Sequence, residues 1–129
     1  MPDEKGAAAV DAWLAALDHP LREVAASVRR ALAGGGADYG EQIKWNAPSF
    51  TRAGEDKITF NLRPKAPLLL ILHRGAKARD KDGFTFADES GLMDWKAPDR
   101  AVVTIASEAD WAANGETITA LARRWLATA

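Results

Sequence analysis

Three residues in the segment 41–45 are of chemical types that recur in binding sites: Glu41, Lys44 and the aromatic Trp45. In a ligand site, Glu41 would accept hydrogen bonds and Lys44 would anchor an anion beside the indole ring. The other interpretation is a structural salt bridge at the start of a sheet, which is the more common use of such a pair. The sequence leaves both interpretations open.

No residues with the spacing of a known catalytic or metal site accompany these three. The chain has no cysteine, and its two histidines, His19 and His73, lack His-x3-His or Glu-x-x-His spacing. None of the serines lies in the Gly-x-Ser-x-Gly context of many hydrolases. We therefore expect a binding protein rather than an enzyme.

The composition is that of one ordinary globular domain spanning residues 1–129, with 47% hydrophobic and 27% charged residues. A net charge of −1, from 17 basic and 18 acidic residues, argues against a nucleic-acid module. The longest apolar run, residues 66–72, is far shorter than the roughly 20 residues that cross a bilayer. Residues 1–5 do not resemble a signal peptide, so we expect a cytoplasmic protein that binds neither membranes nor nucleic acid.

The first third of the chain predicts two amphipathic helices, because apolar residues recur there at helical spacing. These residues are Val10, Trp13, Leu14 and Leu17 in the first helix, and Leu21, Val24, Ala25, Val28 and Leu32 in the second. Pro20 suits the first position of the second helix, where its missing N–H has no cost. The glycines at 34–36 are expected to end that helix.

Strand patterns follow the helices. Residues 57–63 alternate between polar and apolar side chains, which predicts a strand. Residues 68–72 are apolar on both faces, which predicts a central strand covered on both sides. A symmetric hairpin joining the two strands predicts the cross-strand pairs Phe60 with Leu70 and Ile58 with Leu72.

The second face of this hairpin carries Thr59, Asn61, Leu69 and Ile71, a mixture that is unusual for a solvated surface. We expect this face, together with Lys44, either to bind a small molecule or to form the interface of a homodimer. The sequence does not decide between these two uses. Trp95 has polar neighbours and is the best remaining candidate for an aromatic residue in a pocket or an interface.

The end of the chain predicts short strands at 84–86 and 101–106 and then a last helix. Ser107, followed three residues later by Asp110, resembles a capping box with Asp in the Glu position. The pair at 114–115, Asn-Gly, is expected to split this helix into a turn and a longer segment. The order of helices and strands favours an α+β fold, a two-layer sandwich with all helices on one face of an antiparallel sheet.

Three motifs resemble the YdhG-like family of unknown function. They are Glu41-x-Ile43-Lys44-Trp45-x-x-Pro48-x-Phe50, the segment from Asp94 to Val103, and Arg123-Arg124-Trp125-Leu126. The resemblance covers residues 8–127 and implies a topology similar to frataxin.

The resemblance also implies an activity, because at least one family member is described as a frataxin-like intracellular iron chaperone. It implies ferrous iron as the metal, and iron-cluster or haem assembly proteins as partners. Frataxins hold iron on an acidic ridge at the first helix and first strand. The region of this sequence that corresponds to the ridge contains Asp3, Glu4, Asp11, Asp18 and Glu41, and the expected metal ligands among them are Asp11, Asp18 and Glu41.

Overall fold

The computed structural model describes residues 4–32, 39–44, 46–52, 55–73, 86–88, 90–97 and 99–127. Within these ranges, three helices and six strands follow one another. In order they are α1 (Glu4–Ala16), α2 (Arg22–Leu32), β1 (Tyr39–Lys44), β2 (Ala47–Arg52), β3 (Glu55–Asn61), β4 (Leu68–Leu72), β5 (Asp94–Ala97), β6 (Arg100–Ile105) and α3 (Glu108–Leu126).

The six strands form one antiparallel sheet in the order β1-β2-β3-β4-β6-β5. Hairpins join β1 to β2, β2 to β3 and β3 to β4, so most neighbours in the sheet are also neighbours in the chain. The predicted β3–β4 register is confirmed, since Phe60 pairs with Leu70 and Ile58 with Leu72.

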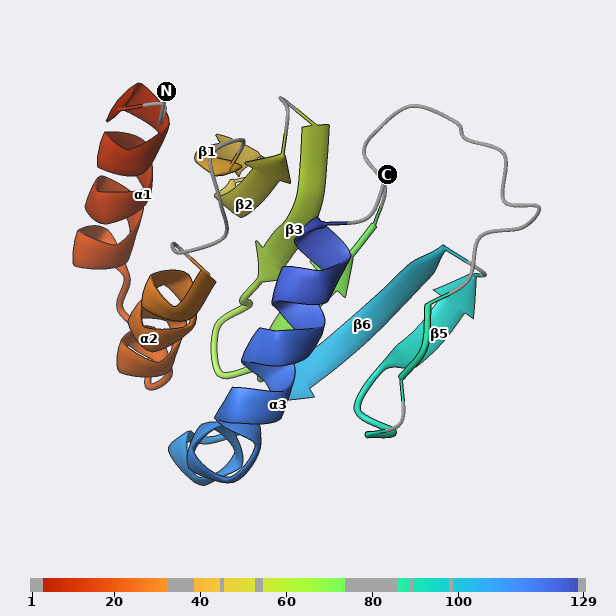
Figure 1. The fold of residues 1–129 in the computed structure, drawn as a ribbon. Coiled ribbons are helices and arrows are strands. Elements are labelled where there is room, and N and C mark those ends of the chain that lie inside the picture. The colour runs from red at the N-terminus through yellow and green to blue at the C-terminus, as the bar shows by residue number, and fades with distance from the viewer. Residues whose placement is uncertain are drawn as a thin grey trace.

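The three helices lie on the same side of the sheet (Figure 1), which confirms an α+β fold with a helical layer on a sheet layer. Apolar side chains from both layers meet in one core. The largest fully buried members of this core are Trp125, Phe50, Phe60, Leu32, Ile58 and Leu68. The apolar stripe of α2 was predicted correctly, since Val24, Ala25, Val28 and Leu32 are all buried.

Several local expectations need correction. Residues 47–52 form β2 and residues 94–97 form β5, although the sequence did not predict either strand. Strand β2 begins directly after Asn46, whose φ of 66° closes the turn. Asparagine tolerates this conformation, but the sequence lacks the glycine that usually marks such a hairpin.

Strand β4 is central in the sheet but is not covered equally on both sides. Leu68, Leu70 and Leu72 are buried, whereas Leu69 and Ile71 are only half-buried. The prediction that β4 is covered on both faces was therefore wrong for the face that carries Leu69 and Ile71. The expected glycine stop at 34–36 lies outside the described residues, as do Phe84 and Thr85 of the short strand expected at 84–86.

The last helix begins as predicted, because the Ser107 hydroxyl accepts a hydrogen bond from the backbone N–H of Asp110. The carboxylate of Asp110 accepts from the backbone N–H of Ala106, one residue before the N-cap. The expected break at 114–115 was wrong, since α3 runs without interruption from Glu108 to Leu126. Packing of the helix against α2 and the sheet outweighs the roughly 1 kcal/mol that a glycine costs inside a helix.

Candidate functional site

Six polar side chains form a hydrogen-bonded network on the sheet face turned away from the helices, which we call the distal face. They come from β1, β2, β3 and the residue after β4: Gln42, Lys44, Ser49, Asp56, Thr59 and His73. Ser49, Asp56, Thr59 and His73 are buried, although no helix of the described part of the chain lies on this face (Figure 1).

Asp56 is the centre of the network. Its Oδ1 accepts a hydrogen bond from Ser49 Oγ at 2.6 Å and another from Gln42 Nε2 at 2.8 Å. Its Oδ2 accepts from Lys44 Nζ at 2.8 Å. The β2–β3 register shifts between Phe50 and Thr51, and such an irregularity can turn a side chain to the other face. This shift brings Asp56 onto the same face as Ser49.

The network continues from Asp56 to the imidazole of His73. Ser49 Oγ lies 3.1 Å from Thr59 Oγ1, and Thr59 Oγ1 lies 2.9 Å from His73 Nε2. The backbone holds His73 in place, since its N–H donates to the carbonyl of Lys57 at 2.9 Å. The indole N–H of Trp125 donates to the His73 carbonyl at 2.9 Å, which ties this residue to the core.

The surroundings of Asp56 keep its carboxyl ionised. Burial alone would raise its pKa, but the hydrogen bonds from Lys44, Ser49 and Gln42 outweigh burial and lower the pKa below its ordinary value. Asp56 is therefore a carboxylate at neutral pH, and a carboxylate only accepts hydrogen bonds.

Beside the network, the distal face is aliphatic. Leu69 and Ile71 of β4 and Val102 of β6 are half-buried there, and Ile71 pairs with both Thr59 and Val102 across the strands. The polar half of the face lies over β1 to β3 and the aliphatic half over β4 and β6. The face therefore offers hydrogen bonds next to apolar surface.

The structure brings together some of the predicted ligand residues and separates others. Lys44 and Thr59 belong to the network, and Asn61 lies next to Thr59 on the same face, opposite Leu69. Glu41 is one residue away from Gln42 and so points to the helical side of the sheet. Trp45 lies outside the described residues.

Glu41 instead belongs to an ion-pair cluster between α1, α2 and β1. The guanidinium of Arg29 donates to the carboxylates of both Glu41 and Asp11, and its Nη2 donates to the carbonyl of Ala7 at 3.2 Å. The hydrogen bonds to Glu41 and Asp11 outweigh burial and raise the pKa of Arg29 above its ordinary value. Of the two first interpretations of Glu41, this arrangement matches the structural salt bridge, with Arg29 rather than Lys44 as the partner.

The three expected iron ligands do not converge in the described residues. Asp11 and Glu41 meet at Arg29, while Asp18 is exposed beyond the end of α1 and takes no part in this cluster. Within the described ranges, no group of three or more His, Cys, Asp or Glu side chains is placed to hold a metal ion. Binding of ferrous iron remains a prediction from the resemblance.

Trp95 lies on the helical side of the edge strand β5 and joins an aromatic cluster. Its ring centroid is 6.1 Å from that of Trp125 and 6.3 Å from that of Phe86. The guanidinium of Arg124 lies over the Phe86 ring at 4.6 Å. Trp95 remains 37% exposed, so it covers the edge of the core and does not reach the distal face.

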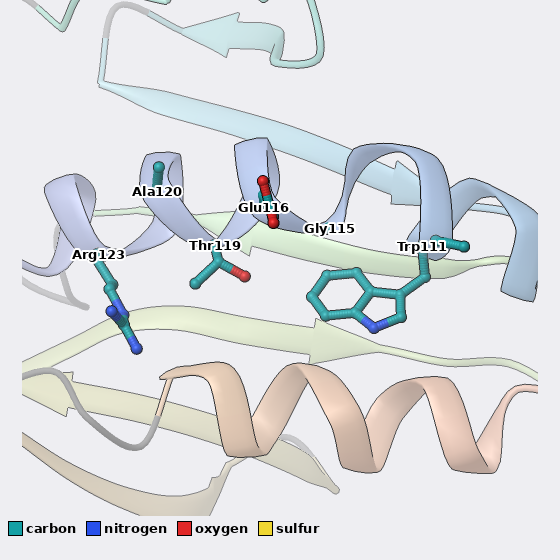
Figure 2. Close-up of a pocket in the computed structure, with 7 residues that line it drawn as sticks. Trp111, Gly115, Glu116, Thr119, Ala120 and Arg123 are labelled. Carbon is teal, nitrogen blue, oxygen red and sulfur yellow. The ribbon is translucent and has the colours of Figure 1, made fainter.

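A groove with a volume of about 570 Å³ runs along α3 on the helical side of the molecule. Figure 2 shows Trp111, Thr119 and Arg123 projecting from α3 toward α2. The lining of this groove also includes Ala112, Gly115, Glu116 and Ala120.

The sequence missed Gln42, Ser49, Asp56 and His73 as partners in one network. Gln42 and Ser49 face each other across the β1–β2 pair, so recognising β2 would have placed them side by side. Asp56 carried no such signal, because the register shift that turns it toward Ser49 cannot be read from alternation. The groove on α3 was missed because Asn114-Gly115 was interpreted as a break.

Comparisons of the chain with protein-family models, with curated proteins and with solved structures found no match. None of the helices in the described ranges combines the length and the apolar character needed to span a bilayer.

Proposed function

We propose that this protein is a non-catalytic binding protein that holds a small, uncharged amphipathic molecule on its distal face. The observation that carries the proposal is the buried network from Lys44 to His73 on a face that no described helix covers. Replacing a buried ion pair such as that between Lys44 and Asp56 by apolar residues of similar volume is often neutral or stabilising. A protein that only needed a stable sheet would have little use for one.

The chemistry of the face selects the class of ligand. Lys44 and Asp56 neutralise each other, and Gln42, Ser49 and Thr59 are uncharged. Within this network, hydrogen bonds are offered without an excess of charge, which suits hydroxyl or amide groups better than ions. The half-buried Leu69, Ile71 and Val102 suit an apolar body attached to such a head group.

The YdhG-like resemblance implies two further candidates, a frataxin-like topology and a role in iron delivery to cluster or haem assembly proteins. Iron delivery has less support than small-molecule binding. Arg29 already neutralises Asp11 and Glu41, and a bound guanidinium competes with a cation for the same oxygen atoms.

The test is a titration of ¹⁵N-labelled protein with hexyl β-glucoside, followed by backbone amide chemical shifts. Hexanoate and hexylammonium are the matched charged probes with the same apolar chain. We expect saturable shifts along β1 to β4 with the glucoside and weaker binding of both ions. Equal binding of all three probes, or shifts spread over the whole surface, would contradict the proposal.

Thr59→Val provides the matching variant, because it keeps the shape of the side chain and breaks the network between Ser49 and His73. We expect the dissociation constant for hexyl β-glucoside to rise by about five- to tenfold, the effect of one or two hydrogen bonds. Thr117→Val is the control, since Thr117 is exposed on α3, on the other side of the sheet.

The alternative is that a second copy of the chain covers the same face in a homodimer, which the half-buried Leu69 and Ile71 favour. Sedimentation equilibrium of the wild type and of Leu69→Asp separates the two. A monomeric mass for both proteins supports the small-molecule proposal. A wild-type dimer that Leu69→Asp converts to a monomer would replace it with the interaction role.

A further inference from the structure

We propose that the groove along α3 is a second ligand site, on the opposite side of the sheet, which binds a planar organic carboxylate. The proposal goes beyond the distal face and does not depend on it. It starts from three hydrogen-bond donors that project from α3 in the same direction: the indole N–H of Trp111, the hydroxyl of Thr119 and the guanidinium of Arg123 (Figure 2).

Two of these donors have no hydrogen-bond partner among the described residues. Trp13 and Trp125 donate their indole N–H groups to backbone carbonyls, whereas the structure gives Trp111 no such acceptor among the described residues. The Thr119 hydroxyl likewise makes no hydrogen bond there. Both groups line the groove, so each can donate to a ligand that enters it.

Arg123 supplies the charge for a carboxylate. Its Nε and Nη2 donate to the carbonyl of Ala31 at 3.2 and 2.8 Å, which holds the guanidinium at the end of α2. Nη1 is not used in this contact and keeps its two hydrogens for a ligand. Thr119 lies four residues before Arg123, so the two side chains are neighbours on one face of the helix.

Trp111 and Gly115 provide a surface for a flat ring. A Cβ at position 115 would lie 3.3 Å from ring atoms of Trp111, so the indole lies directly over this glycine. The missing side chain makes room for the indole, which lines the groove together with Thr119 and Arg123. A planar ligand can rest there with its carboxylate toward Thr119 and Arg123.

Glu116 fixes the orientation of the ligand. It lines the same groove and forms no ion pair among the described residues. It lies seven residues before Arg123, which is about 10 Å along the helix axis. A carboxylate is therefore repelled at the Glu116 end and attracted at the Arg123 end.

The test uses 2-naphthoate as the probe and 2-naphthylmethanol as its uncharged counterpart. Titration into ¹⁵N-labelled full-length protein is followed by the indole N–H signals, and the signal of Trp111 is identified by its loss in Trp111→Phe. We expect a saturable shift of the Trp111 signal with naphthoate. We expect naphthylmethanol to bind about tenfold more weakly, since a charge-assisted hydrogen bond is lost.

Thr119→Val and Thr117→Val form a matched pair on α3, because Thr117 is exposed and does not line this groove. We expect Thr119→Val to weaken naphthoate binding by about fivefold and Thr117→Val to leave it unchanged. Equal affinity for naphthoate and naphthylmethanol would overturn the proposal, as would equal effects of the two variants or no saturable binding. Asp56→Asn, on the distal face, should leave naphthoate binding unchanged, so this result is independent of the first proposal.

Discussion

At the scale of single residues, Asp56 decides how the distal face is organised. Its carboxylate receives hydrogen bonds from Gln42, Lys44 and Ser49, which belong to β1 and β2, while Asp56 itself belongs to β3. One side chain therefore joins three strands on the distal face. Loss of its charge should therefore lower the free energy of unfolding and disturb the order of the network.

We expect Asp56→Asn to lower the free energy of unfolding at pH 7 by about 2 kcal/mol, because Lys44 loses its buried partner. Asp94→Asn is the control, since Asp94 forms an exposed pair with Lys96 that should contribute less than about 1 kcal/mol. Urea denaturation measures the free energy of unfolding of both variants. Equal losses for the two variants would show that Asp56 has no special role.

The same residue predicts a pH dependence. The pKa of Asp56 in the folded protein lies below the ordinary aspartate value of about 3.9. Ionised Asp56 therefore stabilises the fold above that value, and this contribution is lost as the pH falls through the folded-state pKa. In denaturation curves from pH 7 to pH 2, the difference between wild type and Asp56→Asn should shrink below about pH 4. A constant difference would contradict the assignment.

The direction of the hydrogen bonds fixes the tautomer of His73. Ser49 donates its only hydroxyl hydrogen to Asp56, so Thr59 must donate to Ser49 and His73 Nε2 must donate to Thr59. We expect ¹⁵N NMR of the imidazole at neutral pH to show a protonated Nε2. A lone pair on Nε2 would mean that the hydrogen bonds run in the opposite direction.

At the scale of elements, Arg29 joins α1, α2 and β1 through its bonds to Ala7, Asp11 and Glu41. Glu41 is buried and Arg29 is largely so, with side-chain exposures of 8% and 17%. Removal of one partner from such a pair leaves the other charged and desolvated. Among the described residues, the guanidinium of Arg29 therefore links the first helix to the edge strand β1.

We expect Arg29→Met to lower the free energy of unfolding by roughly 3 kcal/mol. Arg30→Met should change it by less than about 0.5 kcal/mol, because Arg30 is exposed and, among the described residues, bonds only to Ser27 of its own helix. The double variant Arg29→Met/Glu41→Gln should lose less than the two single losses added together. Additive losses would show that the two residues are not coupled.

At the scale of the whole molecule, one sheet separates two sides with different chemistry. The helical side carries the core, the Arg29 cluster and the α3 groove, and the distal side carries the polar network and the aliphatic half-face. The two proposed sites therefore do not share residues. Each can be removed by a variant that leaves the other intact.

The acidic residues of the first helix and strand provide a test at the same scale. We expect an anaerobic calorimetric titration with ferrous iron to give no more heat than magnesium, because Arg29 neutralises Asp11 and Glu41. Iron-selective binding that Asp11→Asn and Glu41→Gln weaken would restore the iron-carrier proposal. Asp110→Asn, at the start of α3, is the control for loss of an unrelated carboxylate.

The sequence by itself determined the features that arise from neighbouring residues. Helical spacing predicted the α2 stripe, alternation and turn position predicted the β3–β4 register, and Ser107 predicted the start of α3. These are local effects of side-chain periodicity and of unpaired backbone groups at a helix end. Because they depend on a few adjacent positions, a single sequence is sufficient to read them.

Only the tertiary structure decided which polar side chains meet. The register shift in the β2–β3 pair turns Asp56 toward Ser49, and the pairing of Arg29 with Glu41 joins residues from different elements. The continuity of α3 through Gly115 places Trp111, Thr119 and Arg123 along one groove. Each of these depends on register and packing between distant segments, whose energies are summed over the whole fold and leave no local pattern in the sequence.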